Sequence, residues 1–209
     1  MPDNADLAPR FLEKIGAEGA IMAWAWGFNR VAETLSENPN IDGERIALYG
    51  HSRHAKAALV AAAFEDQANL VISHQSGTGG ASLNFSGIGE SIESIINQYP
   101  HWFSSNYKPY DQNIDRDPID QHHLIALAAP TPIILGNGQH DKWSDPQTAF
   151  RAMEGATPVY ELYGVKGLAQ AKLNKPNFET NLSFHMRPGP HGTRGSDWIA
   201  FLKFLETHF

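Results

Sequence analysis

A chain of 209 residues, 42% hydrophobic and 11% aromatic, is long and apolar enough for one folded domain with a real core, which excludes a disordered protein. Its formal net charge of −7 argues against nucleic acid as the main partner, because phosphate binding requires a basic surface. No apolar run approaches the length of a membrane span, so we expect no membrane partner. The absence of cysteine excludes disulfides, a thiol nucleophile and a cysteine-ligated metal. The polar, acidic segment 1–7 does not have the pattern of a signal peptide.

The hydrophobic pattern predicts helices and strands that alternate along the chain. Helices are predicted at residues 20–37, 53–64, 91–98, 120–128, 146–153 and 195–207. Strands are predicted for short apolar runs at residues 46–49, 70–73, 132–135, 159–162 and 182–186, and the aromatic segment 99–110 is predicted to be a loop. Such alternation indicates a mostly parallel sheet covered by helices.

The most informative stretch begins with an apolar run that ends at Gly50, followed two positions later by Ser52 and then directly by a helical segment. A strand, a sharp turn and a helix are how α/β-hydrolases present a nucleophilic serine, because the strained turn lifts the hydroxyl above the sheet. The helix directs its N-terminal amides at the same position. The usual motif has glycine two residues after the serine, where this chain has His54. The context predicts an α/β-hydrolase fold, a three-layer αβα sandwich, with Ser52 as the nucleophile.

Hydrolases of this fold have several strands before the nucleophile strand. Here only 45 residues precede Ile46, and they contain one clear helix. We therefore expect residues 1–209 to form a single, partial catalytic domain that corresponds to the C-terminal portion of the fold. One side of the sheet would then stand as an exposed edge.

The other two members of a catalytic triad should follow the serine in the order acid, then histidine. The predicted strand 132–135 leads into a loop that ends at Asp141, which places this carboxylate at the edge of the sheet where the serine also lies. Asp145 is the nearby alternative. His191 lies among small residues before the last helix and supplies a base with a pKa near neutral pH, and His185 is its alternative. A single loop aspartate or histidine usually has no catalytic role, and the chain order is what favours one here.

Four motifs together resemble the glucuronoyl esterases of carbohydrate esterase family 15, with the bacterial branch the more similar. They are Gly-His-Ser-Arg-x-x-Lys at 50–56, Ser-Gly-Thr-Gly-Gly at 76–80, Pro-His-Trp-Phe at 100–103 and Asp-Gln-His at 120–122. The resemblance extends from about residue 20 to the C-terminus. It implies a serine esterase that cleaves esters of 4-O-methyl-glucuronic acid in glucuronoxylan, including links to lignin alcohols.

The resemblance also implies a role for several single residues. Ser52 matches the nucleophile and His191 the catalytic histidine, while Arg53 matches a residue that helps hold the oxyanion. The residues that match the sugar-binding positions of the family are Lys56, Glu90 and Trp102. Each of these has an ordinary alternative, because helix-surface charges, a first-turn acid and a core aromatic ring would have the same spacing. Only their occurrence together with the serine turn favours the functional interpretation.

One position departs from part of the family. Some members carry the catalytic glutamate just before the glycine-rich loop, where this chain has Gln75, which cannot be charged. Other members place the acid after the later strand, where Asp141 stands. We therefore expect Gln75 to be a substrate-binding residue that acts by orienting or hydrogen-bonding and not as the acid. Two cysteines that many relatives have are replaced here by His51 and Thr78.

The implied reaction needs no cofactor and no metal, and His122, His123 and His140 do not have the spacing of a zinc site. We expect a monomer, and the family implies a secreted or periplasmic protein. Two alternatives stay open: an acetyl-xylan or general small-ester esterase, and an inactive fragment or carbohydrate-binding relative.

Overall fold

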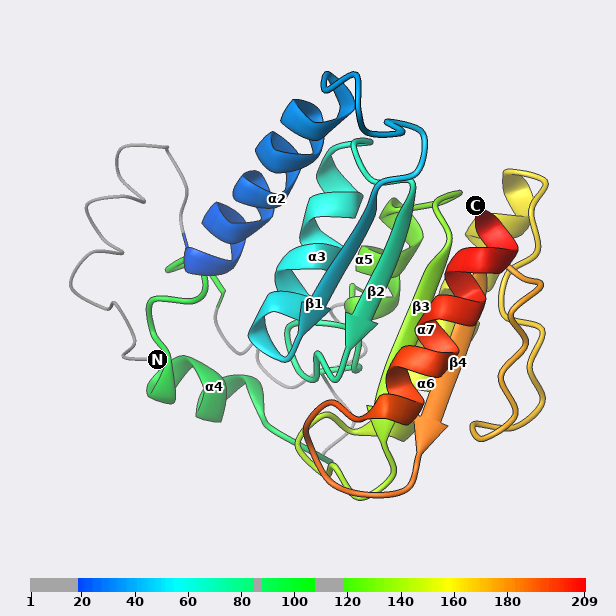
Figure 1. Ribbon diagram of the computed structural model, residues 1–209. Coiled ribbons are helices and arrows are strands. Elements are labelled where there is room, and N and C mark those ends of the chain that lie inside the picture. The colour runs from blue at the N-terminus through cyan, green and yellow to red at the C-terminus, as the bar shows by residue number, and fades with distance from the viewer. Residues whose placement is uncertain (1–18, 85–87, 108–118) are drawn as a thin grey trace.

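The computed structural model describes residues 19–84, 88–107 and 119–209 of the chain. Its centre is a four-stranded sheet in the order β1-β2-β3-β4, in which every neighbouring pair of strands is parallel (Figure 1). The strands are β1 (Ala47–His51), β2 (Leu70–His74), β3 (Ile133–Gly138) and β4 (Leu182–Arg187). Within the described ranges β1 pairs with β2 alone, so β1 forms one edge of the sheet.

Helices cover both faces of this sheet, which gives the expected three layers (Figure 1). One face carries α3 (Arg53–Phe64), α5 (Gln121–Leu127) and α6 (Pro146–Leu162), and α2 (Ala20–Ser36) packs against α3. The opposite face carries α7 (Gly195–His208), and the short α4 (Ile92–Gln98) lies at the end toward which the strands point. No helix in the described part of the chain is long and apolar enough to cross a membrane.

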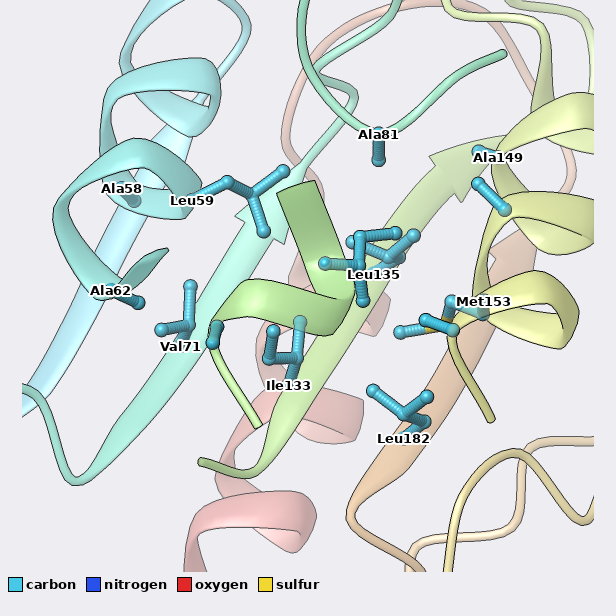
Figure 2. Close-up of a cluster of buried hydrophobic side chains, with 14 of the residues drawn as sticks. Ala58, Leu59, Ala62, Val71, Ala81, Ile133, Leu135, Ala149, Met153 and Leu182 are labelled. Atoms are coloured by element: carbon cyan, nitrogen blue, oxygen red, sulfur yellow. The ribbon is translucent and has the colours of Figure 1, made fainter. Parts of the chain in front are cut away.

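Alternate side chains of the central strands supply two separate apolar cores, because successive residues of a strand point to opposite faces. On one face Val71, Ile133 and Leu135 pack with Leu59 of α3 and Met153 of α6, and all five are fully buried (Figure 2). The other face is closed by a second cluster, which consists of Leu70, Ile72, Ile134, Phe201 and Phe204. Burial of β2 and β3 on both faces explains why their sequences are continuous apolar runs.

One predicted element is wrong: the strand expected at residues 159–162 is the last turn of α6. Pro158, which directly precedes that segment, disfavours a helix there, because proline removes a backbone donor and costs about 3 kcal/mol inside a helix. The helix nevertheless continues, since Tyr160 is completely buried and its hydroxyl donates a hydrogen bond to the carbonyl of Thr131 at 2.8 Å. The Thr157 hydroxyl also donates to the Met153 carbonyl at 3.0 Å. Tertiary packing thus outweighs the local preference. The helix predicted at residues 146–153 therefore extends nine residues further, to Leu162. The other predicted helices and strands are present, with bounds that differ by at most three residues.

Candidate active site

The serine turn lies between β1 and α3 and has the strained geometry that the sequence predicted. Ser52 has φ 57° and ψ −121°, a conformation that a residue with a side chain rarely adopts. Its backbone N–H donates to the carbonyl of His74 at 2.8 Å, which ties the turn to β2. A Cβ on Gly50 would lie 2.1 Å from the carbonyl oxygen of His54, so this position requires glycine. The hydroxyl-bearing residue therefore lies at the N-terminus of α3, at the carboxyl ends of the strands.

His54 replaces the usual second glycine without disturbing the turn. Its side chain is exposed, and its ring packs on the ring of Trp24 with 5.0 Å between centroids. The close approach at this turn involves the backbone of His54 and not its side chain. Only the first glycine of the usual motif is therefore sterically required in this chain.

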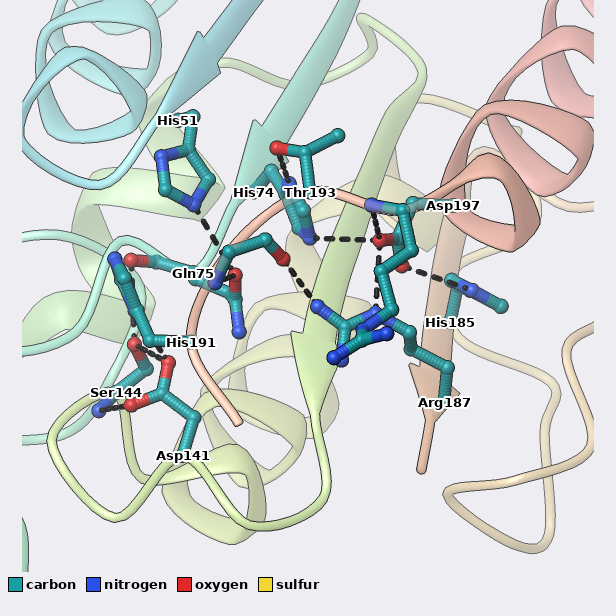
Figure 3. Close-up of polar contacts among 12 residues, drawn as sticks. His51, His74, Gln75, Asp141, Ser144, His185, Arg187, His191, Thr193 and Asp197 are labelled. Carbon is teal, nitrogen blue, oxygen red and sulfur yellow. Dashed lines mark hydrogen bonds and ion pairs between the residues drawn. The ribbon is translucent and has the colours of Figure 1, made fainter. Parts of the chain in front are cut away.

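His191 forms a hydrogen-bonded pair with Asp141 beside the serine turn (Figure 3). Its Nδ1 lies 2.6 Å from Oδ2 of Asp141, and its ring lies 4.7 Å from the ring of His51, the neighbour of Ser52. Burial raises the pKa of Asp141, but hydrogen bonds from His191 and Ser144 outweigh this effect and hold that pKa below its ordinary value. Asp141 is therefore ionised at neutral pH and favours the tautomer of His191 that carries a proton on Nδ1.

The two alternatives have other partners. Asp145 is the N-cap of α6, where its carboxylate accepts a hydrogen bond from the backbone N–H of Thr148 at 3.4 Å. His185 lies on β4, and its Nε2 is 3.4 Å from Oδ1 of Asp197. The geometry thus favours Asp141 over Asp145 and His191 over His185.

Gln75 connects the loop of His191 to the serine turn (Figure 3). Its Oε1 accepts hydrogen bonds from Nε2 of His51 at 3.2 Å and from the backbone N–H of Gly192 at 2.9 Å. Its own backbone has φ 54°, and its N–H donates to the carbonyl of Gly136 at 2.8 Å. An amide suits this position, because its oxygen accepts from both sides without placing a second negative charge beside Asp141.

Lys56 binds the backbone of the glycine-rich loop, residues 76–80, through its ammonium group. It lies one helical turn after Ser52, is 4% exposed, and donates to the carbonyls of Ser76 and Thr78 at 2.5 Å each. Burial lowers the pKa of Lys56 to about 8, while the charge of Glu90 opposes that shift. Burial also raises the pKa of Glu90. An ammonium group has three protons, so two contacts to backbone carbonyls leave one proton to donate to a ligand.

Arg53 and Trp102 contact each other directly. The guanidinium carbon lies 5.2 Å from the centroid of the indole ring, within the range of a cation–π interaction. Trp102 is 6% exposed and stacks on Tyr99 at 3.9 Å, so its position is fixed. Its indole N–H is buried and has no hydrogen-bond partner among the described residues. Trp102 is thus a rigid platform for the arginine as well as a residue that could line a pocket.

The structure contains a second buried polar cluster that the sequence did not predict (Figure 3). Asp197 of α7 is completely buried and accepts a hydrogen bond from Nε of Arg187 at 2.8 Å. His74 of β2 lies 3.7 Å from the same carboxylate, and His185 lies on its other side. Burial raises the pKa of Asp197, but its hydrogen bonds to His185 and Arg187 lower it to about 2. No spacing rule connects these residues, because they come from three elements that meet only in the folded chain.

Within the described ranges there is no group of three or more histidine, aspartate or glutamate side chains arranged to hold a metal ion.

Comparison with known proteins identifies the family of this chain. A family model described as fungal glucuronyl esterase matches residues 12–164. The carbohydrate esterase MZ0003 from an unknown prokaryotic organism is 38% identical over 195 residues, which cover 92% of this chain and 45% of that protein. A 4-O-methyl-glucuronoyl methylesterase from Wolfiporia cocos is 34% identical over 155 residues, which cover 70% of this chain and 38% of that protein.

Solved structures of related proteins share the fold. A promiscuous CE15 esterase from a marine bacterial metagenome superposes with a TM-score of 0.88 at 36% identity, over 100% of this chain and 54% of that chain. A glucuronoyl esterase from Solibacter usitatus gives a TM-score of 0.84 at 35% identity, over 93% of this chain and 50% of that one. The chain thus spans about half the length of these relatives or less.

The layered parallel sheet and the strained serine turn define an α/β-hydrolase, which confirms the predicted fold class. Within that class the chain belongs to the glucuronoyl esterases of carbohydrate esterase family 15, because the family model matches most of its length. The resemblance that the four sequence motifs indicated is therefore confirmed.

His74 makes the stability of this fold depend on pH. Burial lowers its pKa to about 3, so the unfolded chain binds a proton between pH 6.5 and 3 that the folded chain does not bind. The free energy of unfolding should therefore fall as pH falls through this window, with a slope of at most about 1.4 kcal/mol per pH unit from this group. Urea titrations from pH 7 to pH 4 measure this effect. The free energy of unfolding of His74→Phe should depend less steeply on pH than that of the wild type.

Ile72→Val, a control in the same strand, should lower the free energy of unfolding equally at every pH. An unchanged slope in His74→Phe would contradict the assignment.

Proposed function

We propose that this protein is a serine carboxylic-ester hydrolase that cleaves esters of 4-O-methyl-glucuronic acid in glucuronoxylan, including its ester links to lignin. The 2.6 Å hydrogen bond between His191 and Asp141, formed beside the strained Ser52 turn, carries the proposal. Family membership supports the substrate class, since the Wolfiporia cocos relative is named a 4-O-methyl-glucuronoyl methylesterase.

The proposed reaction has two steps that share one base. His191, held by Asp141, takes the proton of the Ser52 hydroxyl as its oxygen attacks the carbonyl carbon of the uronate ester. The alcohol leaves with that proton, and a glucuronoyl ester of Ser52 remains. Water, deprotonated by His191, then attacks the acyl group and releases glucuronate and the serine hydroxyl. Arg53 stabilises the oxyanion in both steps through its charge and its backbone N–H, which lies at the N-terminus of α3.

The sugar is proposed to bind beside the glycine-rich loop. The remaining proton of Lys56 and the carboxylate of Glu90 suit the hydroxyl groups of a uronate ring, and the buried indole N–H of Trp102 provides a further donor. Gln75 acts on the loop of His191 and not on the sugar in this proposal, because its amide oxygen is used by His51 and Gly192. No cofactor or metal takes part in these steps.

A broader esterase activity, on acetylated xylan or small esters, is the second candidate function. It is favoured by one neighbour of known structure, which is described as a promiscuous CE15 esterase. Rates on benzyl or methyl glucuronate, acetylated xylan and p-nitrophenyl acetate distinguish the two, because a glucuronoyl esterase should show the highest kcat/KM on the uronate esters.

Two further features belong to the proposal: the enzyme acts as a monomer, and it acts outside the cytoplasm, in a secreted or periplasmic form that can reach the polymer.

Replacement of the nucleophile tests the proposal. Ser52→Ala should abolish hydrolysis of benzyl glucuronate in the 209-residue chain, because the hydroxyl of Ser52 carries the acyl group in the proposed reaction. Liquid chromatography of the released benzyl alcohol measures this loss, and circular dichroism shows that the variant is folded. Unchanged hydrolysis in the variant would refute the role of Ser52. A folded wild-type chain with no esterase activity would favour the inactive alternative.

The acid of the triad can be tested with a matched pair of variants. Asp141→Asn should lower kcat by about 10⁴-fold, because an amide no longer stabilises the imidazolium or the correct tautomer of His191. Asp145→Asn should leave kcat within a few-fold of the wild type, since asparagine also caps helices well. Steady-state kinetics with a uronate ester measure both. A larger loss from Asp145→Asn than from Asp141→Asn would move the acid to position 145.

A further inference from the structure

The loop that carries His191 rests on the side chain of Arg187, the last residue of β4. Nη1 of Arg187 donates to the carbonyls of Pro188 and Pro190 at 3.1 Å each, and Nη2 donates to the carbonyl of Gly192. The remaining Nε donates to Asp197 at 2.8 Å, and Arg187 as a whole is only 3% exposed. One planar group therefore binds the loop immediately before and immediately after the histidine.

Asp197 neutralises the charge of this buried arginine and orients its side chain. Its Oδ2 accepts hydrogen bonds from Nε of Arg187 and from the backbone N–H of Arg194, both at 2.8 Å. Removal of one member of a buried ion pair leaves the other charge unpaired, which strongly destabilises the folded state. Each member of this pair therefore holds the other in place. Because Asp197 belongs to α7, the pair fixes the loop between β4 and the helix that covers the sheet.

The loop fits closely over this guanidinium. Gly189 has φ 109°, and a Cβ there would lie 3.1 Å from Nη1 of Arg187. On the other side, a Cβ on Gly138 would lie 2.7 Å from the carbonyl oxygens of Gly189 and Pro190. The loop thus has little room to move relative to the end of β3. Gln75 restrains the same loop further, since its side-chain oxygen accepts a hydrogen bond from the backbone N–H of Gly192.

We propose that Arg187, with Asp197 as its counter-charge, is the positioning residue for His191. It sets the backbone of residues 188–192 so that the imidazole meets Asp141 on one side and the Ser52 turn on the other. The inference rests on the proposed function, because it assigns the base of that reaction to His191. Lysine cannot replace Arg187 in this role. The guanidinium donates to four acceptors, which are the carboxylate of Asp197 and three carbonyls of the loop, whereas an ammonium group has only three protons and is not planar.

A matched control variant is needed to distinguish a positioning role of Arg187 from a purely structural one. Gln170 is 8% exposed and holds β4 from outside the site, because its side chain donates to the carbonyl of Phe184 at 2.9 Å and accepts from its N–H at 3.1 Å. Gln170→Ala should destabilise the same strand without touching residues 188–192. It therefore separates loss of stability from loss of positioning.

Two measurements that do not depend on the ester substrate test the proposal in the 209-residue chain. The first is the downfield proton NMR signal of the hydrogen bond between His191 and Asp141, assigned by its absence in Asp141→Asn. The second is the rate at which a fluorophosphonate probe labels Ser52, which reports how well the base activates the nucleophile. Both are applied to Arg187→Lys, to Asp197→Asn as a second variant, and to Gln170→Ala, together with thermal melting.

Arg187→Lys should lose or broaden the downfield signal and label about 100-fold more slowly, the effect expected of a misplacement of about 1 Å. On a uronate ester its kcat should fall while KM stays within about twofold, as expected when an interaction made only in the transition state is weakened. Asp197→Asn should change the signal and the labelling rate in the same direction, and Gln170→Ala should keep both at wild-type values despite a lower melting temperature.

Wild-type signal and labelling in Arg187→Lys would overturn the proposal, as would equal losses in Gln170→Ala. Failure of both Arg187→Lys and Asp197→Asn to fold would also overturn it, because the pair would then have a structural role. If the wild type labels at Ser52 and Arg187→Lys slows labelling, but no uronate ester is cleaved, the positioning role stands and the proposed substrate is wrong. If the wild type does not label, the NMR signal alone decides the positioning role.

Discussion

The parallel alignment of the four strands is the constraint on which the rest of the site depends. Because β1 to β4 all point in one direction, their carboxyl ends bring His51, His74, Gly138 and Arg187 to a single edge of the sheet. Ser52, Asp141 and His191 each follow one of these strand ends within four residues. The packing that holds this register is apolar on both faces of β2 and β3, so the chemistry rests on two buried hydrophobic layers.

The sequence predicted those parts of the molecule that depend on local pattern and chain order. The turn around Ser52 was evident because a strand, a required glycine and a helix follow one another directly. Asp141 and His191 were preferred because they follow the serine in the required order, one just after a strand and the other just before the last helix, while Asp145 and His185 stayed open as alternatives. Only the fold shows that Asp141 and His191 lie 2.6 Å apart. The strand expected at residues 159–162 was wrong, because buried Tyr160 stabilises a helix through a proline that would normally end it.

Contacts between distant segments could not be predicted. Gln75 was expected to orient its neighbours, but only the fold shows that one oxygen joins His51 to Gly192. Likewise, Arg187 and Asp197 are ten residues apart on different elements, and neither has a spacing that suggests a buried ion pair. Both sets of contacts hold the backbone of the loop that carries His191. The base proposed for the reaction is therefore positioned by groups that sequence patterns do not reveal.

The central claim is that Ser52 forms a covalent ester with the uronate during turnover. Acid quenching of the wild-type chain within milliseconds of mixing with benzyl glucuronate, followed by peptide mass spectrometry, tests it most directly. We predict a mass increase equal to one glucuronoyl group on the peptide that contains Ser52, together with a stoichiometric release of benzyl alcohol. Release of the alcohol without an adduct at Ser52, or with an adduct on another residue, would contradict the account.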